Sequence, residues 1–383
     1  MSAGAEERDG GRGRDVNYTT LEVSAAPAGG ERGGGRVEGR VSTRVDGTAA
    51  LRFLEDATLA ETHVNLSAVH AEGRHLWIAG DETATVERLS CADPSRPVDY
   101  GDHVTFALAG LVPLPGAADE EVDVEGMTLA GGYLWVVGSH SAKRKKVKRH
   151  HSDAKAARRL ATVSPEPARR VLARLAIEDD VPVPTAADGR RSLALGKAGV
   201  FDLLRDDVHL APFLGIPGKD NGLDVEGIAV HGERVFLGLR GPVLRGWATV
   251  LQLAPRDGGD ELVLAGVAGD TRYAKHFLDL DGLGIRDLCE DGDDLLVLAG
   301  PSMDLDGPVR VYRWPGAAHL EVPEIVHREE VQRVLDLPYG EGDDHAEGIT
   351  LLLYRRLLVV YDSPAAARIE EPGVVVADVV HLP

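Results

Sequence analysis

Five segments of this 383-residue chain share one pattern: a short polar start, an apolar strand, a tight turn and a second apolar strand. They span residues 65–82, 123–140, 224–242, 284–302 and 345–364. Aligned on the turn and the second strand, their third residues are Ser67, Glu125, Glu226, Arg286 and Glu347. The separations of 58, 101, 60 and 61 residues indicate a unit of about 60 residues. One such unit cannot bury both faces of its sheet, so neighbouring units have to stack.

A third β-like run follows every pair, and a fourth follows in three copies. Four antiparallel strands that recur at a fixed period are typical of a β-propeller blade. The sequence therefore predicts an all-β fold, a β-propeller of five blades with four antiparallel strands each. The last unit lacks a fourth strand, and residues 49–56 are predicted to supply it and close the ring. The 101-residue gap leaves a six-blade ring open, although it contains no sixth copy of the pattern.

Composition divides the chain into an N-terminal arm, residues 1–45, and a single propeller domain, residues 46–383. The arm is rich in glycine and charge and is predicted to be mostly flexible. Residues 141–170 form a basic insertion with eleven Lys or Arg against Asp153 and Glu166. We expect a solvated loop or a tether for an anionic partner. Nucleic acid would bind only weakly through residues 143–170, which lack aromatic residues for base stacking.

The charge balance of the whole chain argues against a general nucleic-acid binder. Sixty-two acidic residues against 42 basic ones give a formal net charge of −20, which favours cations or basic partners. No apolar run approaches the about 18 residues that a membrane-spanning helix needs, and the first residues lack the apolar stretch of a signal peptide. We therefore expect a cytoplasmic protein without membrane association.

In a propeller the start of each first strand and the end of each second strand lie on the same face. One end of the central channel is thus predicted to collect several acids, and crowded carboxylates must be neutralised. A divalent cation, Ca²⁺ or another, would do so through oxygen ligands. The predicted metal ligands are Glu125, Glu226, Glu347, Asp123 and Asp224. Two alternatives remain open: pairing with arginines, or hydrogen bonds in which each glutamate accepts from the backbone of the next blade.

The same face is predicted to carry four candidate catalytic residues. His140 and His345 follow or begin strands there, and either could act as a general base or a metal ligand. Arg240 and Arg286 could clamp an anionic group of a substrate. These residues suggest a metal-dependent hydrolase that acts on a small anionic ligand. The alternative is a non-catalytic scaffold that binds a protein partner and whose glutamates lock the blades together.

The phrases DVEGMTL, DVEGIAVHGERVFLGLRGP, GIRDL, LVLAGPSMDLDGPVRVYRW and HAEGITLL resemble the bacterial family called domain of unknown function 3616, over about residues 60–383. More distantly, the D-x-E-G repeats resemble phytase-like and strictosidine-synthase-like propellers, and acids around a central ion are similar to the calcium-activated apyrase family. Those resemblances imply a metal-dependent hydrolase of phosphate esters or lactones, with Glu125, Glu226 and Glu347 at the matching positions. Ser67 and Arg286 depart from the glutamate pattern, which implies an asymmetric site.

Overall fold

The computed structural model describes residues 45–267, 271–340 and 342–383. Except for its last residue, the predicted N-terminal arm lies outside the described residues. Strands dominate the described chain, so the prediction of an all-β protein is confirmed. No helix in this part of the chain has the length and hydropathy to span a bilayer.

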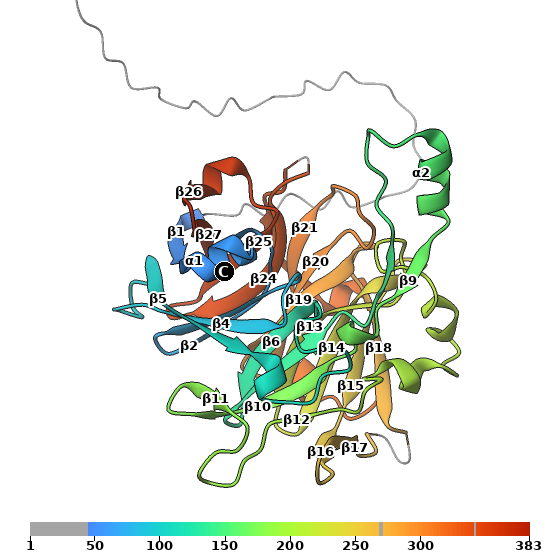
Figure 1. Ribbon diagram of the computed structural model, residues 1–383. Coiled ribbons are helices and arrows are strands. Elements are labelled where there is room, and N and C mark those ends of the chain that lie inside the picture. The colour runs from blue at the N-terminus through green and yellow to red at the C-terminus, as the bar shows by residue number, and fades with distance from the viewer. Residues whose placement is uncertain (1–44, 268–270, 341) are drawn as a thin grey trace, which may run out of the picture. The chain divides into compact units, whose positions relative to one another are not determined.

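Each of the five repeated segments forms two antiparallel strands, and further strands pair onto the second of them (Figure 1). The first sheet contains β2 (Leu66–Glu72), β3 (His75–Gly80), β4 (Thr85–Ser90) and β5 (Asp99–Ala107). The second contains β6 (Val124–Ala130), β7 (Tyr133–Gly138), β10 (Leu172–Glu178), β11 (Val181–Val183) and β12 (Leu193–Ala194). The third contains β13 (Asp224–His231), β14 (Arg234–Leu244), β15 (Trp247–Leu253), β18 (Tyr273–Asp279) and β22 (Ile325–Val326).

The fourth sheet contains β19 (Gly284–Asp291), β20 (Asp294–Gly300), β21 (Val309–Trp314) and β23 (Gln332–Leu337). The fifth contains β24 (His345–Leu352), β25 (Arg356–Asp362), β27 (Val374–His381) and β26 (Ile369–Glu371). Two small hairpins lie outside these sheets: β8 (Ala142–Arg144) with β9 (Val163–Pro165), and β16 (Pro255–Asp257) with β17 (Leu262–Leu264). The α-helices are α1 (Glu55–Leu59) and α2 (Asp153–Leu160).

Short 3-10 turns occupy several connections: η1 (Thr62–Val64), η2 (Leu108–Gly110), η3 (Pro167–Arg169), η4 (Phe201–Leu204), η5 (Ala211–Phe213), η6 (Ala317–His319), η7 (Arg328–Glu330) and η8 (Ala366–Arg368). The predicted basic insertion therefore contains a hairpin, a helix and a 3-10 turn.

The first described strand, β1 (Val45–Arg52), pairs with the last strand of the chain. It runs antiparallel to β27 from Val45 opposite Val380 to Arg52 opposite Val374. It also makes a short parallel pairing with β5, which joins the fifth sheet to the first. Both ends of the described chain are thus held in one continuous sheet.

The first strands of the sheets contact one another in a closed cycle: β2 with β6, β6 with β13, β13 with β19, β19 with β24, and β24 with β2. The apolar core is correspondingly divided into clusters that lie between successive sheets, for example Trp77 of β3 with Met127 of β6, and Leu172 of β10 with Leu237 of β14. Both faces of a sheet are therefore covered, and the second strands are buried along almost their whole length. The described residues from 45 to 383 form a propeller-like arrangement of sheets.

Glycines permit the close approach of the first strands. A Cβ on Gly126 would lie 2.8 Å from the carbonyl oxygen of Glu226, in the next first strand. A Cβ on Gly227 would lie 2.8 Å from the backbone nitrogen of Leu288 in β19. Because the obstructing atoms belong to backbone, a larger residue at either position would push two sheets apart.

We expect Gly227→Ala to lower the free energy of unfolding by about 1–3 kcal/mol, the usual cost of overpacking a core. Urea unfolding followed by tryptophan fluorescence measures this change. Gly101→Ala in β5 is the matched control, because its Cβ meets no atom within 4 Å. Equal stability losses in the two variants would contradict the close approach.

Candidate functional site

The five equivalent repeat residues each occupy a β-bulge. In every first strand the register with the second strand shifts by one residue near the start. A bulge leaves one residue out of the ladder and re-aims its side chain. The residues skipped in this way are Ser67, Glu125, Glu226, Arg286 and Glu347.

Four of these residues line one cavity of about 440 Å³, which we call the acidic cavity. Its charged lining includes Asp81, Glu82, Asp123, Glu125, Asp224, Glu226, Glu347, Asp362, Arg169, Lys219 and Arg240. A second cavity of about 260 Å³, the side cavity, shares Lys219, Arg240 and Glu347 with it and adds Arg286 and His345. All five predicted metal ligands and three of the four predicted catalytic residues thus border these two cavities.

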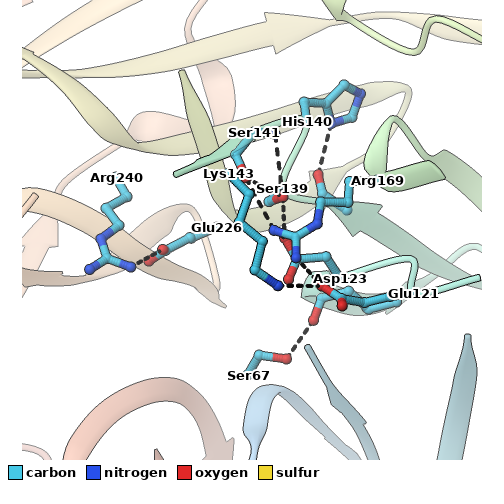
Figure 2. Close-up of polar contacts among 12 residues, drawn as sticks. Ser67, Glu121, Asp123, Ser139, His140, Ser141, Lys143, Arg169, Glu226 and Arg240 are labelled. Atoms are coloured by element: carbon cyan, nitrogen blue, oxygen red, sulfur yellow. Dashed lines mark hydrogen bonds and ion pairs between the residues drawn. The ribbon is translucent and has the colours of Figure 1, made fainter. Parts of the chain in front are cut away.

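Two of the buried glutamates are paired with arginines. Arg240 Nη1 donates to Glu226 Oε1 at 2.9 Å, and both side chains are almost fully buried (Figure 2). Arg286 Nη1 donates to Glu347, and its Nε lies 3.7 Å from Glu226 Oε2. These guanidinium groups oppose the burial that raises the pKa of Glu226. Of the routes to neutralisation that the sequence left open, arginine pairing is present at these two positions.

Asp123 is held by a buried polar network (Figure 2). Arg169 Nη1 donates to Asp123 Oδ2 at 2.6 Å, and Ser139 Oγ donates to the same oxygen. Arg169 also pairs with Glu121. Arg169 was expected to be solvated like the other basic residues of the insertion, but its side chain is buried, with 7% exposure. It follows Pro167 in η3, and nothing in its sequence context distinguishes it from the exposed arginines nearby.

The remaining acids have no ion pair with a basic side chain in the described part of the chain. They include Asp81, Glu82, Glu125, Asp224 and Asp362. Burial raises the pKa of Glu125 well above its usual value, and Asp123 and Glu226 raise it further. Burial, with added repulsion from Asp362, raises the pKa of Asp81 to about 7. The Oδ1 atom of Asp81 is buried without a hydrogen-bond partner.

The two predicted catalytic histidines lie in different surroundings. His345 borders the side cavity, with Nε2 3.5 Å from Asp306 Oδ1. His140 is fully buried: its Nδ1 lies 2.7 Å from the Gly138 carbonyl oxygen, and its Nε2 accepts from the Val200 N–H at 3.1 Å. Burial lowers the pKa of His140 to about 4. The structure therefore does not bring His140 to the acidic cavity, because backbone groups occupy both ring nitrogens.

Two carboxylates accept hydrogen bonds from the backbone of a neighbouring sheet. In the described structure, neither of them belongs to a repeated glutamate. Asp287 Oδ2 accepts from the Ile349 N–H at 2.8 Å, and Glu290 Oε1 accepts from the Val230 N–H at 2.6 Å. The repeat pattern did not single out either residue. A signal was present, since Asp287 replaces the glycine that follows the bulge residue in three other copies.

The start of the basic insertion borders the acidic cavity. Lys143, Arg144, Lys145 and Lys146 belong to its lining. The strand β8 is fixed there, since the Gly218 N–H donates to the Ala142 carbonyl oxygen at 3.1 Å and Arg144 Nε lies 2.6 Å from Asp220 Oδ2. This part of the insertion therefore forms a wall of the cavity, and its role as a tether for an anionic partner stays a prediction.

The acidic cavity is not a ready-made cage for a metal ion. Among the described residues, three ligand atoms lie within 4.8 Å of one another only at His231, Asp293 and His319, away from this cavity. A cation in the acidic cavity would therefore draw fewer than three close carboxylate ligands from the described residues and would need other oxygen ligands for the rest.

Comparison with known proteins identifies the family. The family described as "Protein of unknown function (DUF3616)" matches residues 65–378, so the chain belongs to it. A search of curated proteins finds no match.

Solved structures of similar arrangement include the glutaminyl cyclase of Myxococcus xanthus, with 10% identity, 88% of this chain and 98% of that chain covered, and a TM-score of 0.38. For the PQQ-bound aldose sugar dehydrogenase of Streptomyces coelicolor the identity is 13% and the TM-score 0.35, and the match covers 88% of this chain and 100% of the dehydrogenase chain. For the endosialidase of phage phi92 the identity is 9% and the TM-score 0.37, and the match covers 88% of this chain and 69% of the endosialidase chain.

The raised pKa of Asp81 predicts a pH-dependent stability. In the folded chain Asp81 keeps its proton up to about pH 7, against 3.8 for an ordinary aspartate, so the folded state binds more protons between these values. Its contribution to the free energy of unfolding therefore falls as the pH rises from about 4 to about 7. Asp81→Asn should raise stability at pH 8 by on the order of 4 kcal/mol and change it little at pH 4. Urea unfolding of both proteins across this range tests the prediction, and a pH-independent difference would contradict it.

Proposed function

We propose that the acidic cavity is the catalytic site of a divalent-cation-dependent hydrolase for small anionic substrates, either phosphate esters or lactones. One observation carries the proposal: Asp81, Glu125, Asp224 and Asp362 line the cavity without a basic partner in direct contact, beside glutamates that arginines already neutralise. Burying unpaired carboxylates is costly unless a cation or a proton compensates their charge.

The donor set suits a cation that keeps several non-protein ligands. No three carboxylate oxygens of the described cavity lining lie within 4.8 Å of one another. Mg²⁺ is commonly held by one or two carboxylates together with water and substrate oxygens, whereas Ca²⁺ takes six to eight ligands. Glu125 and Asp81 would hold such an ion, and it would polarise the substrate and lower the pKa of a bound water.

The protein residues would divide the remaining tasks. Asp81, whose pKa is about 7 without an ion, would give up its remaining proton when the cation binds near neutral pH. Arg240, Arg286 and Lys219 border the two cavities and can hold an anionic group. The Nε atoms of both arginines have no hydrogen-bond partner in the described structure. The lysines of the insertion would attract an anion from solution.

The architecture that supports this site is, in our proposal, a five-blade propeller closed by β1. The cycle of contacts among β2, β6, β13, β19 and β24 supports the count. The pairing of β1 with β27 supports its role as the fourth strand of the last blade. A ring of this kind brings one bulge residue from every blade to the same end of the channel.

A cation bound to the cavity should stabilise the folded state. For protein stripped with a chelator, we expect the melting temperature to rise saturably with Mg²⁺, Mn²⁺ or Ca²⁺. A ligand at about 100 times its dissociation constant contributes about 2.7 kcal/mol. Glu125→Gln combined with Asp81→Asn should abolish the shift and also any phosphoesterase or lactonase activity found by screening.

Glu72→Gln is the control for loss of one negative charge, because Glu72 is exposed at the other end of β2. A shift that persists in the double variant, or that disappears in the control, would refute the cation site.

A second candidate function is a scaffold for a protein partner. The observation in its favour is that Arg286 of β19 lies against both Glu226 of β13 and Glu347 of β24. One buried guanidinium group thus links three successive first strands. In this case the glutamates and arginines serve the assembly of the sheets and the insertion docks the partner.

One variant separates the two functions. Residues 146–161 are replaced by a short Gly-Ser linker, which keeps β8, β9 and Arg169, the partner of Asp123. Loss of a co-purified partner with unchanged cation binding would favour the scaffold. For the hydrolase we expect retained cation binding and a higher KM for anionic substrate at low salt, because Lys146 and its basic neighbours are lost.

A further inference from the structure

His231, Asp293 and His319 converge at the end of β13 that lies opposite Asp224, a residue of the acidic cavity. His231 is the last residue of β13, and Asp293 lies in the turn between β19 and β20. His319 is the last residue of η6. Three segments that are 26 or more residues apart in the chain thus bring two imidazoles and one carboxylate together.

The distances between these side chains suit a shared metal ion. One ligand atom from each residue lies within 4.8 Å of the others, and His319 Nε2 is 2.8 Å from Asp293 Oδ1. The rings of His231 and His319 stand edge to face, with centroids 5.1 Å apart. Ligands at 2.0–2.1 Å around tetrahedral Zn²⁺ are separated by about 3.3 Å. Small rotations of the side chains would therefore bring all three to one ion.

The backbone holds the three segments in place. The Ala318 N–H donates to the Asp293 carbonyl oxygen at 3.1 Å, and the Gly316 N–H donates to Asp294 Oδ1 at 2.9 Å. Ala317 and Ala318 of η6 are buried, which anchors the turn that carries His319. Arg234, next to the hairpin of His231, donates to the Ala318 carbonyl oxygen at 3.4 Å. Its charge is partly offset by Glu321 at 3.5 Å.

We propose that His231, Asp293 and His319 form a binding site for a borderline transition-metal dication, with Zn²⁺ as the ion of choice. Imidazole nitrogen together with a carboxylate favours Zn²⁺, Cu²⁺, Ni²⁺ or Fe²⁺ over Mg²⁺ and Ca²⁺. The ion would link β13 of the third sheet to the loops of the fourth. Asp293 and His319 are exposed, so one or more coordination positions stay open to water. This site is separate from the acidic cavity and does not depend on the function proposed there.

The test is a Zn²⁺ titration of the untagged, chelator-stripped full chain in competition with a chromophoric chelator. We expect one equivalent of Zn²⁺ to bind. His231→Ala, Asp293→Asn and His319→Ala should each weaken binding by more than the about 10- to 100-fold typical of changing an outer-shell partner. Co²⁺ bound at the same site should give d–d absorption that is lost in the same variants.

His150→Ala is the matched control, because it removes an exposed imidazole from the insertion. It should leave Zn²⁺ affinity unchanged. The unfolding midpoints of the three ligand variants are compared in chelator, where removal of one half-buried and two exposed side chains should change them little. The proposal would be overturned if the wild-type chain did not bind Zn²⁺ or if the three ligand variants kept the wild-type affinity for Zn²⁺. A loss of Zn²⁺ affinity in the His150→Ala control would also overturn it.

Discussion

The close approach of five first strands is the constraint on which the rest of the structure depends. Backbone atoms of neighbouring strands come so near at Gly126 and Gly227 that a methyl group does not fit between them. A bulge just before each of these glycines turns one side chain out of the ladder. The same geometry that seals the core therefore collects five polar side chains at one end of the strands and removes them from bulk water.

Charge compensation then determines what that end of the molecule can do. Arg240, Arg286 and Arg169 are directed at Glu226, Glu347 and Asp123, and they leave other carboxylates without a direct basic partner. An incompletely neutralised cluster favours any ligand that brings positive charge or gives up protons to it. The asymmetry has its origin in the repeat itself, because one of the five equivalent positions is a serine and another is an arginine.

Sequence periodicity predicted the all-β class, the five strand pairs and the grouping of the bulge residues, since all of these follow from a local pattern repeated about every 60 residues. Residues outside the repeat were less predictable. Arg169 lies in a run of basic residues, and only the fold of the insertion sets it against Asp123. His140 ends a strand as the repeat predicts, yet a left-handed backbone conformation with φ of 57° and two backbone partners keep its ring inside the protein. Long-range loop packing decided both outcomes, and no local pattern encodes it.

The pairing of β1 with β27 has a consequence for synthesis of the chain. During translation, residues 45–52 leave the ribosome more than 300 residues before their antiparallel partner, residues 374–381. The sheet that joins the two ends can form only after the final strand has been released. Until then the strands of the fifth sheet lack their outer neighbour, and the chain presents open edges that a chaperone or a second nascent copy can occupy.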